Sequence, residues 1–175
     1  MKNFISEYVE YALPQTAASR KYHIFMAYML VSQCIGTKAT YHGFGGVKSP
    51  NLWINVLGPS SMGFKSTVLR IGSDLLHEVF ADMPYRLPND GSSESFIECL
   101  DIQRKGIILS DEFVNLLQWM EKDYSWSLLG LLTNLYDQPR NYIRRVGTRD
   151  KAKTYNLGGV FINAIQLRRT PQRRL

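Results

Sequence analysis

The sequence predicts an α/β fold with a mostly parallel sheet. Three short apolar runs, at residues 52–57, 107–110 and 160–165, have the length and composition of buried strands. Longer stretches with helical spacing of their apolar residues lie between them. Strands that alternate with helices are typical of crossover connections, which join parallel strands. With 175 residues, 45% of them hydrophobic and 21% charged, the chain is long enough to bury the core of one domain.

A helical segment and a connector, residues 1–50, precede the predicted core. Two helices are expected, at residues 1–13 and 17–35, and Pro14 separates them because proline interrupts a helix. Residues 37–50 contain three glycines and end in a proline, which predicts turns.

The core, residues 51–175, contains the alternating elements. The helix expected at 66–80 carries an apolar stripe. Ser92 or Ser93 is the expected N-cap of the helix at 94–103, since a serine hydroxyl accepts a hydrogen bond from the first turn. In chain order we expect a strand at 52–57, a helix at 66–80, a short strand at 85–87, a loop at 89–93, a helix at 94–103, a strand at 107–110, a helical region at 113–136, a hairpin of 142–145 and 153–156, and a strand at 160–165.

The loop after the first strand is close to a phosphate-binding pattern. Its residues, LGPSSMGFKST, nearly match G-x-x-x-x-G-K-[ST], but one extra residue, Phe64, separates Gly63 from Lys65. Backbone N–H groups of such a loop surround phosphate oxygens, a lysine reaches the β- and γ-phosphates, and a hydroxyl ligates Mg²⁺. The residues in position for these roles are Gly58, Ser60, Ser61, Gly63, Phe64, Lys65, Ser66 and Thr67, with Lys65 as the lysine, Ser66 as the hydroxyl and Thr67 as its alternate.

Phe64 occupies a position where glycine is favoured. Glycine there permits φ > 0 and a close approach of the backbone to the ligand, which a bulky aromatic residue resists. We therefore expect the loop to bulge differently upstream of Lys65. The alternative is a glycine- and serine-rich turn that precedes a helix and binds nothing.

Polar residues at two other strands are candidates for the same site. Asp111 and Glu112 follow the strand at 107–110; there, Asp111 would hold Mg²⁺ and Glu112 would deprotonate the attacking water. An acidic N-cap for the next helix is the alternative. Asn163 is the one polar residue within the run 160–165. It either contacts the γ-phosphate or the attacking water, or it is a buried amide that the backbone satisfies.

Charge is unevenly distributed along the chain. Residues 140–175 contain ten Lys and Arg and one acid, which leaves eleven basic and fourteen acidic residues in the first 139. A basic end on an acidic body is typical of a nucleic-acid partner such as DNA, although a solvated surface gives the same pattern. Within Arg140 to Arg174, the predicted hairpin would supply arginines for phosphates and Tyr142 and Tyr155 for stacking on bases.

Cysteine usage and hydropathy suggest where the protein resides. The two cysteines and three histidines have no metal-ligand spacing, which argues against a zinc site and favours a reducing compartment. The apolar stretch at 24–31 is too short to span a bilayer, and we find no signal-peptide pattern. We expect a cytoplasmic protein with no membrane partner.

Five segments of the sequence, taken together, resemble a known group of P-loop ATPases. The group is the uncharacterised primase-helicase-like family of phages, plasmids and other mobile elements, and the similarity extends over about residues 1–165. Its most specific parts are the irregular loop and the Asp-Glu-Phe strand end. Loops of this family often carry a residue other than glycine before the lysine, as Phe64 does here. The segments are NLWINVLGPSSMGFKSTVL, SSESFIECL, GIILSDEF, LLTNLYDQPRNYIRR and LGGVFINAI.

The resemblance implies a three-layer P-loop NTPase core of the AAA+/RecA-like division, with ATP and Mg²⁺ as cofactors and a homo-oligomeric ring as its assembly. It implies Lys65 and Ser66 on phosphate and Mg²⁺, Asp111 on Mg²⁺, Glu112 as base and Asn163 as sensor. Such proteins continue past the sensor strand to an arginine finger, whereas this sequence ends in QLRRTPQRRL, so binding is better supported than turnover.

Three hypotheses for the function therefore stand. The leading one is an ATP-binding, ATP-hydrolysing module of a replication or helicase-like protein from a mobile element. The second is a nucleic-acid-binding module with a vestigial nucleotide site. The third is a purely structural fragment whose sheet lacks its last strand.

Overall fold

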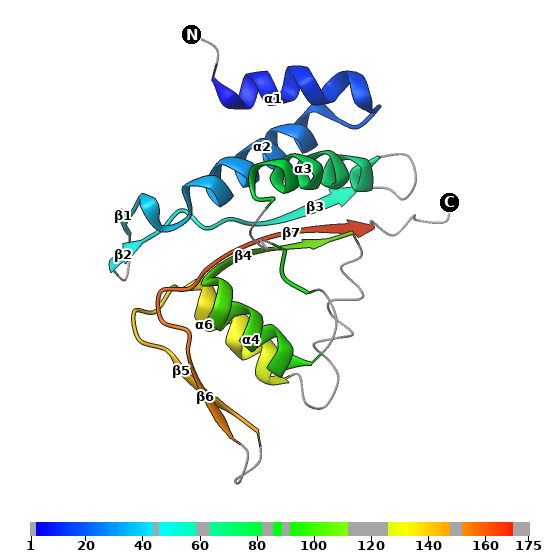
Figure 1. The fold of residues 1–175 in the computed structure, drawn as a ribbon. Helices are drawn as coiled ribbons and strands as arrows, with labels where there is room; N and C mark the ends of the chain where they lie inside the picture. Colours follow the sequence, from blue (N-terminus) through cyan, green and yellow to red (C-terminus); the bar gives the residue numbers. More distant parts are fainter. Residues whose placement is uncertain are drawn as a thin grey trace.

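The computed structural model describes residues 3–43, 46–58, 64–81, 86–88, 92–111, 126–147 and 152–169. Among these, no helix is both long and apolar enough to cross a lipid bilayer. Figure 1 shows the helices and strands, with η marking a 3₁₀-helix. They are α1 (Phe4–Ala12), η1 (Leu13–Gln15), α2 (Arg20–Ile35), η2 (Gly36–Lys38), β1 (Tyr41–Gly43), β2 (Gly46–Lys48), β3 (Trp53–Gly58), α3 (Lys65–Val79), α4 (Ser93–Gln103), β4 (Lys105–Ser110), α6 (Trp126–Tyr136), β5 (Ile143–Val146), β6 (Lys153–Asn156) and β7 (Phe161–Arg169).

Three parallel strands form the central sheet, in the order β3-β7-β4. The last of these strands in the chain therefore lies between the other two. Ala164 of β7 pairs with Trp53 of β3 on one side and with Ile108 of β4 on the other. The mostly parallel sheet expected from the sequence is confirmed.

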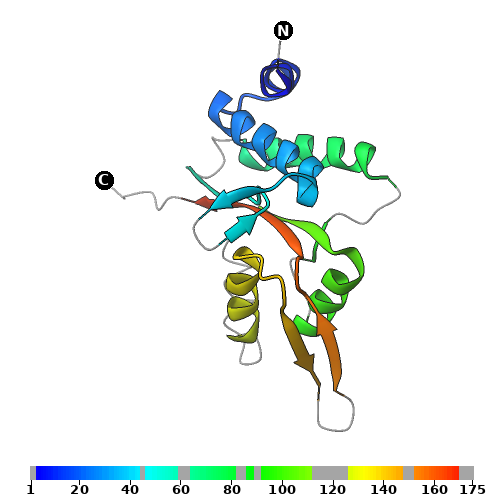
Figure 2. The same cartoon turned by 90° about the vertical axis from the view of Figure 1, so that its left-hand side faces the viewer.

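Helices cover both faces of this sheet (Figures 1 and 2): α2 and α3 lie on one face, and α4 and α6 on the other. Each face has its own hydrophobic cluster. The first includes Ile107 and Ile165 with residues of α1, α2 and α3, and the second includes Ile108 and Ile162 with residues of α4 and α6. Successive strand residues point to opposite faces, so β4 and β7 are apolar on both sides. The predicted α/β class is confirmed.

The two N-terminal helices lie on the same side of the sheet as α3. α1 lies against α2, and α2 lies against α3 (Figure 1). Asn3 caps α1 and Ser19 caps α2, each by accepting a backbone N–H of the first turn. A Cβ on Gly72 of α3 would lie 2.1 Å from Met26 Cε of α2, so glycine permits this close packing. Both helices expected in this part of the chain are confirmed.

The connector predicted as turns contains a small ladder. β1 and β2 pair in antiparallel fashion over three residue pairs, which is too short for a periodic signal in the sequence. Ser49 and Asn51, which follow this ladder in the chain, are hydrogen-bonded to the end of α6 and to the turn after it. Ser49 N donates to Gln138 Oε1 at 2.7 Å, Gln138 Nε2 donates back to Ser49 O at 3.0 Å, and Asn51 Nδ2 donates to Tyr136 O at 3.1 Å.

Most of the predicted core elements are present, and three differ in extent. Ser92 is the N-cap of α4, and the predicted hairpin is confirmed as β5–β6. The last strand extends four residues beyond 165, because pairing with β3 accommodates polar residues that the apolar run omits. Of the helical region expected at 113–136, residues 112–125 lie outside the described residues and α6 accounts for the remainder. Of the short strand expected at 85–87, the described residues contribute one parallel bridge, from Arg86 to Ile107.

Candidate functional site

The predicted phosphate-binding loop runs from the end of β3 to the start of α3. Gly58 is the last residue of β3 and Lys65 is the first of α3; Ser60, Ser61 and Gly63 lie outside the described residues. The amino end of α3 faces this loop and carries no acidic residue in its first turn. Unpaired N–H groups and the helix dipole give such an end a partial positive charge, which favours an anion.

Phe64 takes up the left-handed backbone conformation, with φ +44° and ψ +30°, directly before α3. The aromatic residue thus adopts φ > 0 despite the resistance expected of it. Its ring is half-exposed, 47%, so it avoids a clash by lying at the surface. A non-glycine residue in this conformation stores roughly 1–2 kcal/mol of strain. Phe64 therefore has a backbone conformation that glycine adopts more readily.

Lys65, the first residue of α3, reaches back to the end of β3. Its side chain is buried, 8% exposed, and its Nζ donates to the carbonyl oxygen of Gly58 at 3.1 Å. A Cβ on Gly58 would lie 2.5 Å from the hydroxyl of Tyr22, which itself donates to Leu57 O at 3.3 Å. Glycine at position 58 thus leaves room for the Tyr22 hydroxyl. A buried ammonium at a loop between a strand end and a helix start is a suitable partner for phosphate oxygens.

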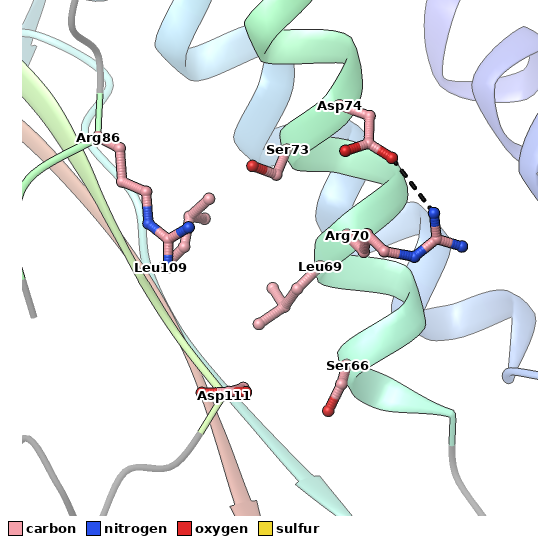
Figure 3. A pocket seen from close by; sticks show the side chains of 8 residues that line it. All are labelled: Ser66, Leu69, Arg70, Ser73, Asp74, Arg86, Leu109 and Asp111. Carbon is pink, nitrogen blue, oxygen red and sulfur yellow. Dashed lines mark hydrogen bonds and ion pairs between the residues drawn. The ribbon is translucent and has the colours of Figure 1, made fainter.

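A cleft of about 300 Å³ opens between α3 and the end of β4 (Figure 3). Ser66, in the first turn of α3, and Asp111, directly after β4, lie at the same end of it on opposite walls. Both residues are exposed, whereas Thr67 is half-buried and does not line the cleft. The full lining is Ser66, Leu69, Arg70, Ser73, Asp74, Arg86, Leu109 and Asp111.

The strand order explains why Ser66 and Asp111 converge. β3 and β4 are parallel and both flank β7, so their carboxyl ends lie at the same edge of the sheet. The two strands are two interstrand spacings apart, about 10 Å, which leaves room for a ligand between α3 and the acid. Hydroxyl and carboxylate oxygens are the ligands that Mg²⁺ prefers. Glu112 lies outside the described residues.

Two arginines line the cleft and differ in their partners. Arg70, on the α3 wall, is paired: its Nη1 lies 3.4 Å from Asp74 Oδ2, another residue of the lining (Figure 3). Arg86 comes from the opposite wall, beside β4, and its guanidinium reaches into the cleft. Within the part of the chain that the structure describes, no ion pair or hydrogen bond involves that guanidinium.

Asn163 is not part of this cleft, so its predicted role as sensor or catalytic residue is not supported. It lies near the amino end of β7, whereas the cleft lies at the carboxyl end of the sheet. Its Oδ1 accepts from Leu52 N at 2.7 Å and Ser32 Oγ at 2.9 Å, and its Nδ2 donates to Gln33 Oε1 at 2.9 Å. The alternative of a buried, satisfied amide therefore describes it, with side chains of α2 as partners as well as backbone.

The hairpin β5–β6 projects from the domain as an arm (Figures 1 and 2). Tyr155, expected to stack on bases, is buried, and its hydroxyl donates to Glu98 Oε1 at 2.8 Å. Lys153 Nζ donates to the same oxygen at 3.1 Å, and these two hydrogen bonds lower the pKa of Glu98. Tyr142 packs on the second hydrophobic cluster. In the described part of the hairpin, arginines such as Arg145 are therefore available, while the two tyrosines expected to stack on bases pack against the domain.

Sequence reasoning did not single out Arg86 as a site residue. Its signal in the sequence is a charged residue inside the short stretch Tyr85-Arg86-Leu87, which has strand character. The neighbouring Leu87 is buried, so this stretch lies against the core. A charged side chain in such a stretch must reach solvent or a ligand, because burying an unpaired charge is costly. The bridge to Ile107 that carries Arg86 to the cleft depends on tertiary pairing, which the sequence does not reveal.

No protein-family model matches the chain, and no curated protein matches its sequence.

Proposed function

We propose that this protein binds Mg²⁺ and ATP in the cleft at the carboxyl end of the sheet, as the P-loop ATPase module of a replication or helicase-like protein of a mobile element. One observation carries the proposal: Ser66 on the first turn of α3 and Asp111 at the end of β4 face one cleft. The buried Lys65 at the adjoining loop and the sequence resemblance support it further.

The roles of the residues follow from their chemistry. The amino end of α3 and the Lys65 ammonium attract the phosphates, because both supply N–H donors with positive charge. The Ser66 hydroxyl and the Asp111 carboxylate are the ligands for Mg²⁺, which when bound offsets phosphate charge. Glu112 follows Asp111 in the chain and is the proposed general base for a water molecule.

Calorimetric titration of Mg-ATP into the wild type and Lys65→Met tests the phosphate site. Methionine keeps the buried alkyl stem and removes the ammonium, so we expect binding to weaken by about tenfold or more without loss of the fold. Ser66→Ala and Thr67→Ala form a matched pair: only the first should weaken Mg²⁺-dependent binding, since Thr67 does not line the cleft. Equal binding by wild type and Lys65→Met contradicts the proposal.

A second candidate function, DNA binding, is favoured by the projecting hairpin and its arginines. Arg145 is exposed near the end of β5, and electrostatic contacts to DNA phosphates weaken as salt displaces them. We expect Arg145→Ala to reduce the slope of log affinity against log salt by about one. Lys153→Ala is the matched control, because Lys153 is already paired with Glu98. A slope that Arg145→Ala leaves unchanged removes the hairpin from the interface.

A further inference from the structure

The cleft continues along α3 beyond Ser66 and Asp111 to Arg86. The backbone of Arg86 bridges to Ile107, four residues before Asp111 on the neighbouring strand. Leu87 belongs to the hydrophobic cluster on the α4 and α6 face and packs over Gly106. Because successive residues in a strand point to opposite faces, Arg86 points to the α3 face. Its guanidinium enters the cleft in the direction of Asp111 (Figure 3).

The charges around the cleft leave the Arg86 guanidinium available to a ligand. Asp74, the other acid of the lining, is paired with Arg70 at 3.4 Å. Among the described residues, none is hydrogen-bonded or ion-paired to the Arg86 guanidinium, and the residue is exposed. An arginine is always charged and presents five N–H donors in a planar fork, which matches phosphate oxygens.

The order of groups along the cleft determines which phosphate Arg86 meets. Lys65 and the amino end of α3 lie on the loop side, Ser66 and Asp111 lie opposite one another, and Arg86 lies on the acid side beside β4. A chain of phosphates that starts at the loop and binds Mg²⁺ between Ser66 and Asp111 ends on the side of β4. The terminal phosphate is therefore the group nearest to Arg86.

We propose that Arg86 binds the terminal phosphate from within the same chain and so makes the site selective for nucleoside triphosphates over diphosphates. This inference rests on the proposed function, because it requires that the cleft bind nucleotide. It adds a positive charge on the side opposite Lys65, so that the terminal phosphate lies between two cationic side chains. A diphosphate, which lacks that group, makes no contact with Arg86.

The test is a calorimetric titration with two ligands and three proteins. The ligands are Mg²⁺ with adenosine 5′-(β,γ-imido)triphosphate, which resists hydrolysis, and Mg²⁺ with ADP. The proteins are the full-length wild type, Arg86→Gln and the matched control Arg70→Gln. Both arginines are exposed, so both variants keep the fold; Arg70 lines the same cleft but is paired with Asp74. Circular dichroism verifies the fold of each.

We expect Arg86→Gln to weaken binding of the triphosphate by about tenfold or more, as for loss of a charge-assisted hydrogen bond, and to change ADP binding less than about twofold. Arg70→Gln should change neither by more than about twofold. Nucleotide binding by the wild type with a triphosphate-to-diphosphate ratio unchanged in Arg86→Gln overturns the role of Arg86 and leaves the proposed function intact. A wild type that binds neither ligand overturns the proposed function and the role of Arg86 with it.

Discussion

Polar side chains gather at both ends of the central sheet, and the two groups differ in burial and in hydrogen bonding. At the amino end, Asn163, Ser32 and Gln33 are buried, and Asn163 is hydrogen-bonded to each of the other two. At the carboxyl end, Ser66, Arg86 and Asp111 are exposed around a cleft; within the described part of the chain, no side-chain hydrogen bond joins them.

The difference separates a structural network from a candidate binding site. A buried polar group costs stability unless it is bonded, so the amino-end network joins α2, the chain before β3 and β7 into one unit. Exposed groups of opposite charge that converge without bonding each other remain able to bind a ligand. Sequence position suggested one site for Asn163 and Asp111 together, but the structure assigns them to opposite ends.

The largest effect is expected at the carboxyl end, from Asp111→Asn. Loss of the carboxylate removes a proposed ligand of Mg²⁺, so Mg²⁺-dependent ATP hydrolysis or binding should fall at least about 100-fold, as chelation of Mg²⁺ by EDTA would also cause. The unfolding transition should stay in place, since Asp111 is exposed. Asp74→Asn is the control in the same cleft. Equal losses in both variants count against a specific role for Asp111.

At the amino end, Asn163→Ala is expected to lower stability and to leave nucleotide affinity unchanged. Loss of the amide leaves Leu52 N without an acceptor and Gln33 Oε1 without a donor, whereas Ser32 Oγ still donates to Pro50 O. The free energy of unfolding should fall by about 2–3 kcal/mol in urea denaturation. Asn55→Ala, on the exposed side of β3, should change it by less than about 0.5 kcal/mol. If nucleotide affinity falls while stability does not, Asn163 belongs to the site after all.

A smaller effect is expected at Phe64, where strain lies next to the cleft. Phe64→Gly should be more stable than Phe64→Ala by about 1 kcal/mol, because glycine adopts φ +44° without strain and alanine does not. Comparing these two variants cancels the loss of the ring. Equal stability by thermal unfolding would mean that the left-handed conformation at this residue carries no strain.

The smallest effect is expected for His23. This buried residue of α2 belongs to neither the amino-end nor the carboxyl-end group of polar side chains. Both its ring nitrogens lack a hydrogen-bond partner within the described residues, its ring lies 6.2 Å from that of Tyr8, and burial lowers its pKa. Because its pKa is lower in the folded protein, His23 takes up a proton at a lower pH there than in the unfolded chain, which does so near pH 6.5. Stability is thus fully present above that pH and should fall by up to about 0.7 kcal/mol between about pH 7 and pH 6.

His23→Phe removes the titrating group and both unpartnered nitrogens, so its unfolding free energy should not vary over this range. His77→Gln, at an exposed position of α3, should keep the wild-type dependence. A wild type whose stability is constant from pH 7 to pH 6 shows that His23 gains no charge on unfolding in that range.

The sequence alone determined the class of the fold and most of its elements, the β1–β2 ladder excepted. Runs of apolar residues, serine caps and glycine turns act over a few residues, so they predicted β3, β4 and β7, the helices between them, the hairpin and Ser92 as a cap. They also marked the loop before Lys65 and the acid at the end of β4 as candidates for one site.

Only the tertiary structure decided which of those residues meet. The order β3-β7-β4 brings Ser66 and Asp111 to one edge, moves Asn163 to the other and brings Arg86 in through a single bridge. It also turns Tyr155 inward to Glu98 and allows Phe64 its left-handed backbone. The physical reason is that propensities and caps depend on neighbours in the chain, whereas strand order and register depend on burial of both faces of a sheet by distant residues.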